Sequence, residues 1–460
     1  MVAFSPANRH HSNYATRHYM ETSIRTKLFI MMVLEFFIWG AWLPKIFGYL
    51  PAIGFSDDQR LAILLCFPVA AVIGMFFSNQ FADRSFAAEK FLAVSHLIGG
   101  LAILGLGFLK PDANGAVEFW SFFALMAIHC LLYVPTMSIA NSIAFANIKD
   151  PVRDFGMVRM GGTIGWILAA WPFIFLLVDW DKVSAPKTEG FVSWMGTVLG
   201  SPLKGRALVD GTRWTYIVAG IASLLLAAFS LTLPHTPPKK AQPGETPAWA
   251  AAFGLLKHPV ILVLWIVTFI DAFVHNTYFL YTDGFLSSPG VGIASNWTQA
   301  VMSIGQVAEI LTMFILGLTL RKLGWKATMI VGILGHALRF LIYAYMPDQQ
   351  WLIILVQIVH GICYAFYFAT IYIYVDECCP KDIRTSVQGL FNLMIFGLGD
   401  IAAKIYWTYS GDKTFTKADK TLDYGNLFLV PAGLAIVAVL ILIACFKPAT
   451  ARPAAAVTGH

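Results

Sequence analysis

Apolar runs long enough to cross a membrane alternate with short polar segments along the whole chain. An α-helix needs roughly 18 or more apolar residues to span the hydrocarbon layer, so a run of this length predicts a transmembrane helix. Such runs occupy residues 28–50, 60–79, 91–109, 118–146, 157–178, 214–233, 259–282, 297–319, 327–346, 350–375, 383–408 and 425–446. The pattern therefore predicts an all-α membrane protein with twelve transmembrane helices.

A Pro- and Lys-rich segment at 234–258 divides the twelve predicted helices into two sets of six, and the halves echo each other in short motifs such as 150–153 and 380–384. We expect a disordered cytoplasmic tail at 1–26, six-helix bundles at 27–233 and 259–447, a cytoplasmic linker at 234–258 and a cytoplasmic tail at 448–460. Two six-helix halves joined in this way are the plan of the major facilitator superfamily. In that plan the substrate site lies between the halves, near the membrane midplane.

The composition supports a membrane protein, because 58% of the 460 residues are hydrophobic and 13% are charged, whereas a soluble protein carries about 25% charged residues. Lys and Arg gather at both termini and in the even-numbered loops, which predicts that both termini are cytoplasmic. Loops 179–213 and 409–424 carry several lysines and depart from this rule. The formal net charge of +6 follows from the topology and does not indicate nucleic-acid binding. We expect a multi-pass monomer in the inner membrane, surrounded by the lipid bilayer.

Two polar residues stand three positions apart inside the eighth predicted helix. Gln306 and Glu309 share one face of that helix, and no nearby residue in the sequence neutralises Glu309. A charged carboxylate costs about 3 kcal/mol at the centre of a membrane-spanning helix. The pair is therefore expected to face a partner, a water-filled cavity or a ligand.

The fifth predicted helix carries a second polar stripe, formed by Arg159, Thr163 and Trp166. These positions are i, i+4 and i+7, so they lie on one face of a helix. Arg159 stands near the cytoplasmic end and has a simpler interpretation, in which its side chain only reaches out to the membrane surface.

The seventh and tenth predicted helices supply further polar candidates. Asp271, His275 and Tyr278 form one stripe, where an acid four residues before a histidine is typical either of a proton relay or of a structural hydrogen-bonded pair. In the tenth helix, Tyr364 lies deep enough to favour contact with a ligand, although tyrosines in such helices also serve packing.

Two more acids complete the set of candidates for proton coupling. Asp400 precedes Lys404 by one helical turn, which predicts an ion pair within the helix, with a role in coupling as the alternative. Glu35, in the first helix, has no evident partner in the sequence and is a second acid that could bind a proton. The candidates for proton coupling are therefore Glu309, Asp271, Glu35 and Asp400.

The sequence contains no phosphate-binding loop of the ATP-hydrolysing type and no nucleophile–base constellation. We therefore expect neither an enzyme nor an ATP-driven pump, and the sequence predicts no cofactor and no metal site. An ion gradient or the gradient of the solute itself would drive transport, and intramembrane acids make protons the natural coupling ion.

The chain resembles the bacterial nucleoside:proton symporters of the major facilitator superfamily. The segments that carry this resemblance occur in order along the whole chain, at residues 37–43, 96–99, 133–136, 141–143, 159–166, 232–237, 302–310, 338–340 and 380–389. The resemblance implies a nucleoside held between the halves, and it places Arg159, Thr163, Gln306 and Glu309 at binding positions. It also implies proton-coupled uptake by alternating access.

The sequence departs from the family pattern at several of these positions. Trp166 stands where the family has Phe, and His275 and Tyr278 stand where it has Gln and Asn. Tyr364 and Ala365 replace a Phe-Asp pair, so that an acid of the family is absent. The expected binding residues are therefore Arg159, Thr163, Trp166, His275, Tyr278, Gln306, Glu309 and Tyr364.

The sequence thus predicts a nucleoside importer of the inner membrane that uses protons. There are two alternatives. One is a carrier of the same architecture for another small solute, such as a sugar derivative or a nucleobase, and the other, from another functional class, is a solute sensor that does not transport. Uptake of a nucleoside panel into proteoliposomes would separate the three.

Overall fold

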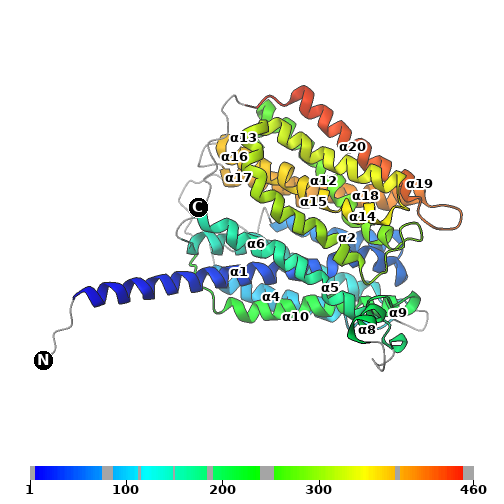
Figure 1. Ribbon diagram of the computed structural model, residues 1–460, viewed down its shortest axis with the longest axis horizontal. Helices are drawn as coiled ribbons and strands as arrows, with labels where there is room; N and C mark the ends of the chain where they lie inside the picture. Colours follow the sequence, from blue (N-terminus) through cyan, green and yellow to red (C-terminus); the bar gives the residue numbers. More distant parts are fainter. Residues whose placement is uncertain are drawn as a thin grey trace.

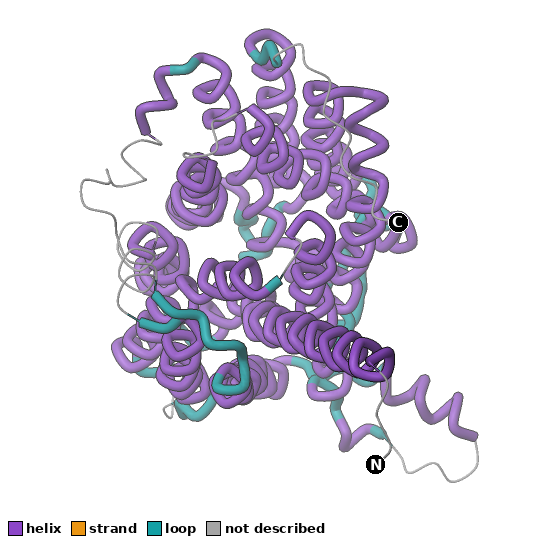
Figure 2. The backbone as a smooth tube through the Cα atoms, turned by 90° about the vertical axis from the view of Figure 1, so that its left-hand side faces the viewer, coloured by secondary structure: helices purple, strands orange, loops and turns teal. Residues whose placement is uncertain are grey.

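The structure is a computed structural model that describes residues 6–74, 86–111, 116–148, 151–183, 190–238, 253–378 and 384–448. Over these ranges the chain forms helices joined by turns and loops, with two isolated β-bridges, and Figure 2 displays helix beside helix. Most of the predicted linker, at 239–252, and of the predicted C-terminal tail, at 449–460, lies outside the described residues.

The helices before the linker are α1 (Pro6–Ala52), α2 (Asp57–Ile73), α4 (Ala88–Leu106), α5 (Phe119–Asn147), α6 (Pro151–Ala170), α7 (Pro172–Leu176), η2 (Trp180–Lys182), α8 (Gly190–Leu199), α9 (Gly205–Thr212) and α10 (Trp214–Ser230). Those after it are η3 (Leu255–Lys257), α12 (Pro259–Leu286), α13 (Thr298–Tyr345), α14 (Gln350–Leu355), α15 (Ile358–Cys363), η4 (Tyr364–Ala369), α16 (Thr370–Cys378), α17 (Arg384–Asn392), η5 (Leu393–Leu398), α18 (Gly399–Tyr406), η6 (Trp407–Gly411), α19 (Asp412–Phe415) and α20 (Tyr424–Cys445).

Ten helices among the described residues are long and apolar enough to cross a membrane. Two predicted helices are not counted separately. The described part of α2 has only 17 residues, and α13 covers nearly all of both 297–319 and 327–346. Within α13 the helical backbone is interrupted at Gly324, which has φ 73° and ψ 177°. Glycine adopts a positive φ without a steric penalty, so this residue permits the change of direction.

The first helix is longer than the sequence pattern predicts. It begins at Pro6, so the expectation of a disordered tail at 1–26 is corrected: from residue 6 onward the tail continues the first helix. No proline or glycine stands between Pro6 and Gly40 to end a helix, and polar residues do not interrupt helical backbone geometry. The hydrophobic pattern marks only the part of the helix that lies among apolar neighbours.

Local signals in the loops set where two of the helices begin. Ser56 and Gln59 form a reciprocal capping box at the start of α2. Glu118 caps α5 by accepting hydrogen bonds from the backbone N–H groups of Ser121 and Trp120. These bonds, led by the one from Ser121, stabilise the ionised carboxylate and lower the pKa of Glu118.

The buried apolar residues form two separate cores, one for each half of the chain. The first is built from residues between Leu28 and Leu233, and the second from residues between Ile261 and Phe446. Within the first core, α1 and α6 approach so closely that a Cβ atom added to Gly165 would overlap the carbonyl of Val33. Figure 1 displays α1, α4, α5, α6 and α10 together, apart from α12, α13 and α20.

Polar contacts join the two halves at the end of the molecule that carries α8, α9 and α19 (Figure 1). Lys45 Nζ of α1 lies 2.7 Å from Asp283 Oδ1 of α12. Tyr409 donates a hydrogen bond to Asp58 at 2.7 Å. Asn296, just before α13, donates one to the carbonyl of Ile174 at 3.1 Å. These bonds tie α1, α2 and α7 to the second half, so this end of the interface between the halves is closed.

Candidate functional site

Polar side chains from both halves meet in the middle of the apolar helices. Arg159 and Thr163 come from α6, Glu309 from α13 and Tyr364 from η4, and we call these four residues the cross-half cluster. Thr163 Oγ1 lies 3.5 Å from Glu309 Oε1. Arg159 is close enough to Glu309 for their opposite charges to attract, and its guanidinium lies over the ring of Phe36, 4.2 Å from the centroid.

The members of the cross-half cluster are half-buried rather than fully enclosed, although they belong to apolar helices. A buried charge is costly unless it is paired or reaches water. Arg159 and Glu309 both keep an accessible surface, and Glu309 contacts Thr163 of the other half. The cluster is therefore suited to exchange the Thr163–Glu309 contact for contacts with the polar groups of a bound solute.

A glycine sets the position of Glu309. Gly361 of α15 lies so close to α13 that an added Cβ atom would overlap the backbone of Ala308 and Glu309. Substituting Gly361 by valine is expected to lower stability by about 1–3 kcal/mol, because overpacking of a tight helix contact forces the backbones apart. Thermal unfolding in detergent measures this. The matched control is Gly433→Val on α20, where a Cβ atom meets nothing within 4 Å. Equal transition temperatures for the two variants would contradict the prediction.

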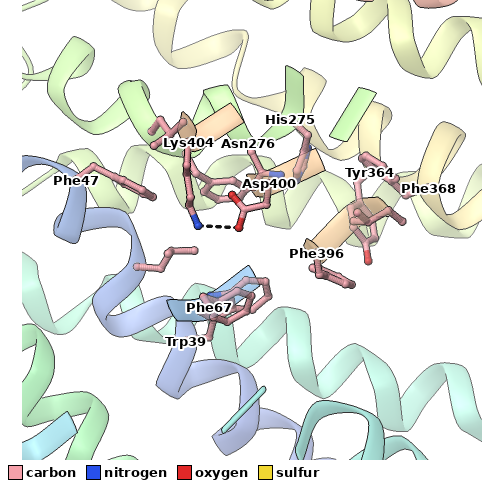
Figure 3. Close-up of a pocket in the computed structure, with 14 residues that line it drawn as sticks. Trp39, Phe47, Phe67, His275, Asn276, Tyr364, Phe368, Phe396, Asp400 and Lys404 are labelled. Atoms are coloured by element: carbon pink, nitrogen blue, oxygen red, sulfur yellow. Dashed lines mark hydrogen bonds and ion pairs between the residues drawn. The ribbon is translucent and has the colours of Figure 1, made fainter. Parts of the chain in front are cut away.

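A cavity lies beside the cross-half cluster and is walled mainly by aromatic rings (Figure 3). The cavity is narrow, with about 50 Å³ of space for the centres of water-sized molecules, and it is partly open to solvent. Trp39 stacks on Phe67 with ring centroids 4.9 Å apart and an interplanar angle of 10°. Fourteen side chains from both halves line the cavity: Trp39, Leu43, Phe47, Phe67, His275, Asn276, Phe279, Leu280, Tyr364, Phe368, Ile395, Phe396, Asp400 and Lys404. Tyr364 belongs both to this wall and to the cross-half cluster.

An ion pair forms one side of the cavity. Lys404 Nζ donates to Asp400 Oδ2 at 2.7 Å, which confirms the predicted pair within the helix. Figure 3 shows the two side chains pointing toward each other across the cavity from Tyr364. The cavity thus has charged groups near two sides and flat apolar surfaces between them.

The remaining predicted binding residues occupy different surroundings. Trp166 packs against Trp39, with ring centroids 5.0 Å apart, and so supports the aromatic wall from behind. Gln306 is 6% exposed, and its Oε1 atom has no hydrogen-bond partner within the described chain. His275 lines the cavity, as expected of a binding residue.

Tyr278, a predicted binding residue, does not line the cavity. Its side chain is fully buried, its hydroxyl donates to Gln357 Oε1 at 3.1 Å, and Arg339 lies over its ring at 4.1 Å. It therefore belongs to the interior of the second half and not to the cavity wall. Residues three apart on a helix differ in direction by about 60°, which turns Tyr278 away from the cavity that His275 lines.

The expectation that Glu35 lacks a partner is wrong. Its carboxylate lies 2.9 Å from His96 Nε2 and accepts a hydrogen bond from Thr136 at 2.8 Å. His96 is held in turn by Ser223, 3.0 Å from its Nδ1 atom. These partners come from α4, α5 and α10, which are distant in sequence, so the sequence pattern did not reveal them. Glu35 is a hydrogen-bonded residue of the first core.

Several phenylalanines line the cavity without having been predicted from the sequence, including Phe67, Phe279 and Phe396. A phenylalanine in an apolar helix carries no signal that distinguishes a cavity wall from lipid contact or core packing. Polar residues in the same helices do carry such a signal, because their burial is costly. This difference explains why the polar half of the site was predictable and the aromatic half was not.

The fold and the site between the two halves define a helical transporter of the major facilitator type. The solved structure of a D-xylose-proton symporter shares this fold, with a TM-score of 0.65 at 15% identity over 92% of this chain and 98% of that chain. The chain belongs to the nucleoside H+ symporter family, whose model, described as "Nucleoside H+ symporter", matches residues 20–200 and 187–451.

Individual relatives span nearly the whole chain. The Escherichia coli protein "Putative nucleoside transporter YegT" is 30% identical over 428 residues, which cover 91% of this chain and 92% of the relative. "Nucleoside permease NupG" of Escherichia coli is 27% identical, over 92% of this chain and 96% of the relative. A crystal structure of nucleoside transporter NupG has a TM-score of 0.70 at 25% identity and covers 92% of this chain and 99% of that chain.

Proposed function

We propose that the protein carries nucleosides across the membrane together with protons, by alternating access of a site between its two halves. Membership of the nucleoside H+ symporter family supports this function. The observation in the site that supports it is the contact between Thr163 and Glu309, which brings together a polar group from each half.

The chemistry of a nucleoside matches this arrangement at both of its ends. The ribose offers vicinal hydroxyl groups, which Glu309 binds as an acceptor and Gln306 binds as an acceptor or donor. The base offers carbonyl and imino groups to Arg159 and Thr163, and a flat face to the rings of Trp39 and its neighbours. Each charge-assisted hydrogen bond contributes roughly 1.5–3 kcal/mol. We place Tyr364 and His275 on the same wall as further contacts.

The finer topology is part of the proposal. We count α2 and the two parts of α13 as separate spans, which gives twelve spans in two halves of six. Both termini are then cytoplasmic, the membrane is the inner membrane, and the closed end that holds Lys45 and Asp283 faces away from the cytoplasm. Closure by these bonds supports an inward-facing conformation. Transport then requires the Lys45–Asp283 ion pair to break.

Uptake by purified protein in proteoliposomes tests the function. We expect a labelled nucleoside to accumulate when an inward proton gradient is imposed, and only to equilibrate without one. A competition panel then defines the solute. Unlabelled nucleosides are expected to compete at least about tenfold more strongly than free ribose or free base, because neither fragment reaches both ends of the site.

Other outcomes distinguish the rival functions. Equal competition by free base or by a sugar would identify a carrier for that solute. Nucleoside binding without uptake would identify a sensor. Either result would contradict the proposal.

A further inference from the structure

A second polar cluster lies inside the core of the second half, where the binding site does not reach. Asp271 of α12, His336 and Arg339 of α13 and His360 of α15 come together there, and we call these four residues the Arg339 cluster. Their exposed fractions are at most 2%, so the cluster is closed to bulk solvent. Isolated charges in such a place are strongly unfavourable, which means that its protonation states are set by its own members.

The geometry fixes the protons on the two histidines. Arg339 Nη1 lies 3.0 Å from His360 Nδ1, and Arg339 Nη2 lies 2.9 Å from His336 Nδ1. A guanidinium has only donors, so each Nδ1 atom must be an acceptor. Both rings are therefore neutral, with their hydrogen on Nε2. A second proton on either ring would have to displace Arg339.

Asp271 is the group of the cluster that is free to take a proton. Neither of its oxygens has a hydrogen-bond partner within the described chain, and Oδ1 lies 3.8 Å from His336 Nε2. An ionised carboxylate without a donor in a buried site is several kcal/mol less stable than a paired one, and a proton removes this penalty. The arrangement therefore fits a protonated Asp271. When the proton leaves, Arg339 supplies the compensating charge from the same cluster.

The other titratable groups around Asp271 do not compete for this role. Cys363 of α15 and Tyr367 of η4 are neutral groups that face it, and the Tyr367 hydroxyl lies 3.1 Å from Thr268 Oγ1. On α18, which packs against α12, Asp400 and Lys404 are paired with each other. The segments η5 and α20 bring no titratable side chain except Tyr424 and Cys445, at the two ends of α20.

His275 lies between the Arg339 cluster and the cavity. It stands one turn after Asp271 on α12, it lines the cavity, and its Nδ1 atom has no hydrogen-bond partner within the described chain. Its ring centroid is 5.1 Å from that of His360 and 5.6 Å from that of His336. A neutral imidazole can accept a proton at one nitrogen and release one from the other. His275 is thus placed to pass protons between the cavity and the cluster.

We propose that Asp271 is the binding site of the transported proton, that Arg339 is its counter-charge, and that His275 is the route by which the proton enters from the cavity. The proposal rests on the proposed function and assigns substrate and proton to different acids. Glu309 holds the nucleoside at the interface between the halves, and Asp271 holds the proton inside the second half.

Asp271→Asn tests this assignment in proteoliposomes that enclose a pH-sensitive dye. Wild-type protein is expected to take up protons when nucleoside is added outside and to accumulate the nucleoside. In the variant, proton uptake and nucleoside accumulation are both expected to fall at least about tenfold. Counterflow exchange of labelled nucleoside is expected to stay within about twofold of wild type, because exchange needs the solute site but no net proton movement. Asp348→Asn, which removes the carboxylate of an exposed loop residue, is the matched control and is expected to keep proton uptake.

Each result decides the assignment. Proton uptake by the Asp271→Asn variant at half the wild-type level or more would overturn it, and so would loss of counterflow in a variant that still binds nucleoside. If the variant does not yield folded protein, His336→Gln replaces it. That variant is expected to move the pH midpoint of accumulation by at least about half a unit, because it removes the N–H group nearest the carboxylate, and an unmoved midpoint would overturn the assignment. Wild-type protein that transports no nucleoside would contradict the proposed function instead.

Discussion

Replacing Arg159 by alanine is expected to raise the apparent dissociation constant for nucleosides at least about tenfold, the equivalent of about 1.4 kcal/mol. The substitution removes charge-assisted hydrogen bonds to the base, which contribute roughly 1.5–3 kcal/mol each. It also leaves Glu309 without the opposite charge that attracts it. Isothermal titration calorimetry on purified protein measures the change.

Two further variants separate recognition by Arg159 from a general effect of charge. Arg159→Lys keeps the positive charge but loses the planar fork, so its affinity should fall between those of wild type and alanine. Arg213→Ala removes an exposed arginine at the start of α10 and serves as the control, with wild-type affinity expected. Wild-type affinity in Arg159→Ala would exclude Arg159 from the binding site.

Replacing Glu309 by glutamine is expected to reduce proton-driven accumulation of nucleoside at least about tenfold, because binding is weakened by a charge-assisted bond of roughly 1.5–3 kcal/mol. Glutamine is close in shape, but it carries no charge to balance Arg159, and its amide cannot accept hydrogen bonds from both ribose hydroxyls as strongly as a carboxylate does. Uptake and calorimetric affinity are measured on the same preparation.

Comparing Glu309→Gln with Asp271→Asn separates the role of Glu309 in nucleoside binding from the role of Asp271 in proton binding. Glu309→Gln is expected to lower nucleoside affinity, whereas Asp271→Asn is expected to leave affinity within about twofold of wild type and to remove proton uptake. Asp348→Asn, in an exposed loop, is the neutral control for the loss of a carboxylate. Unchanged affinity and unchanged accumulation in Glu309→Gln would remove Glu309 from the site.

The interface between the halves gives these predictions a common structural basis. The halves are tied together at the end that holds Lys45 and Asp283 and meet again at Thr163 and Glu309. A solute that binds Glu309 replaces its contact with Thr163 by contacts to the solute. The cross-half cluster can therefore respond both to bound nucleoside and to the movement of one half against the other.

Much of this architecture was predictable from the hydrophobic pattern, because a helix must satisfy its own backbone in a membrane and needs a fixed length to cross it. The pair Asp400–Lys404 was predictable for a similar reason, since residues one turn apart are neighbours on any helix. The join at Gly324 and the early start of α1 at Pro6 were not predictable, because a hydrophobic pattern marks apolar surroundings and not helical backbone.

By itself, the sequence determined the all-helical membrane class, the division into two halves, the family and the polar residues that face the interface, such as Arg159 and Glu309. These follow from local periodicity and from the cost of placing charge in hydrocarbon. Only the tertiary structure decided which buried acids have partners. In the sequence Asp271 precedes a histidine by one turn and Glu35 has no evident partner, yet Glu35 is bonded to His96 and Thr136, while Asp271 accepts no hydrogen bond in the described chain. The partners of Glu35 come from helices far apart in the sequence, and packing alone brings those helices together.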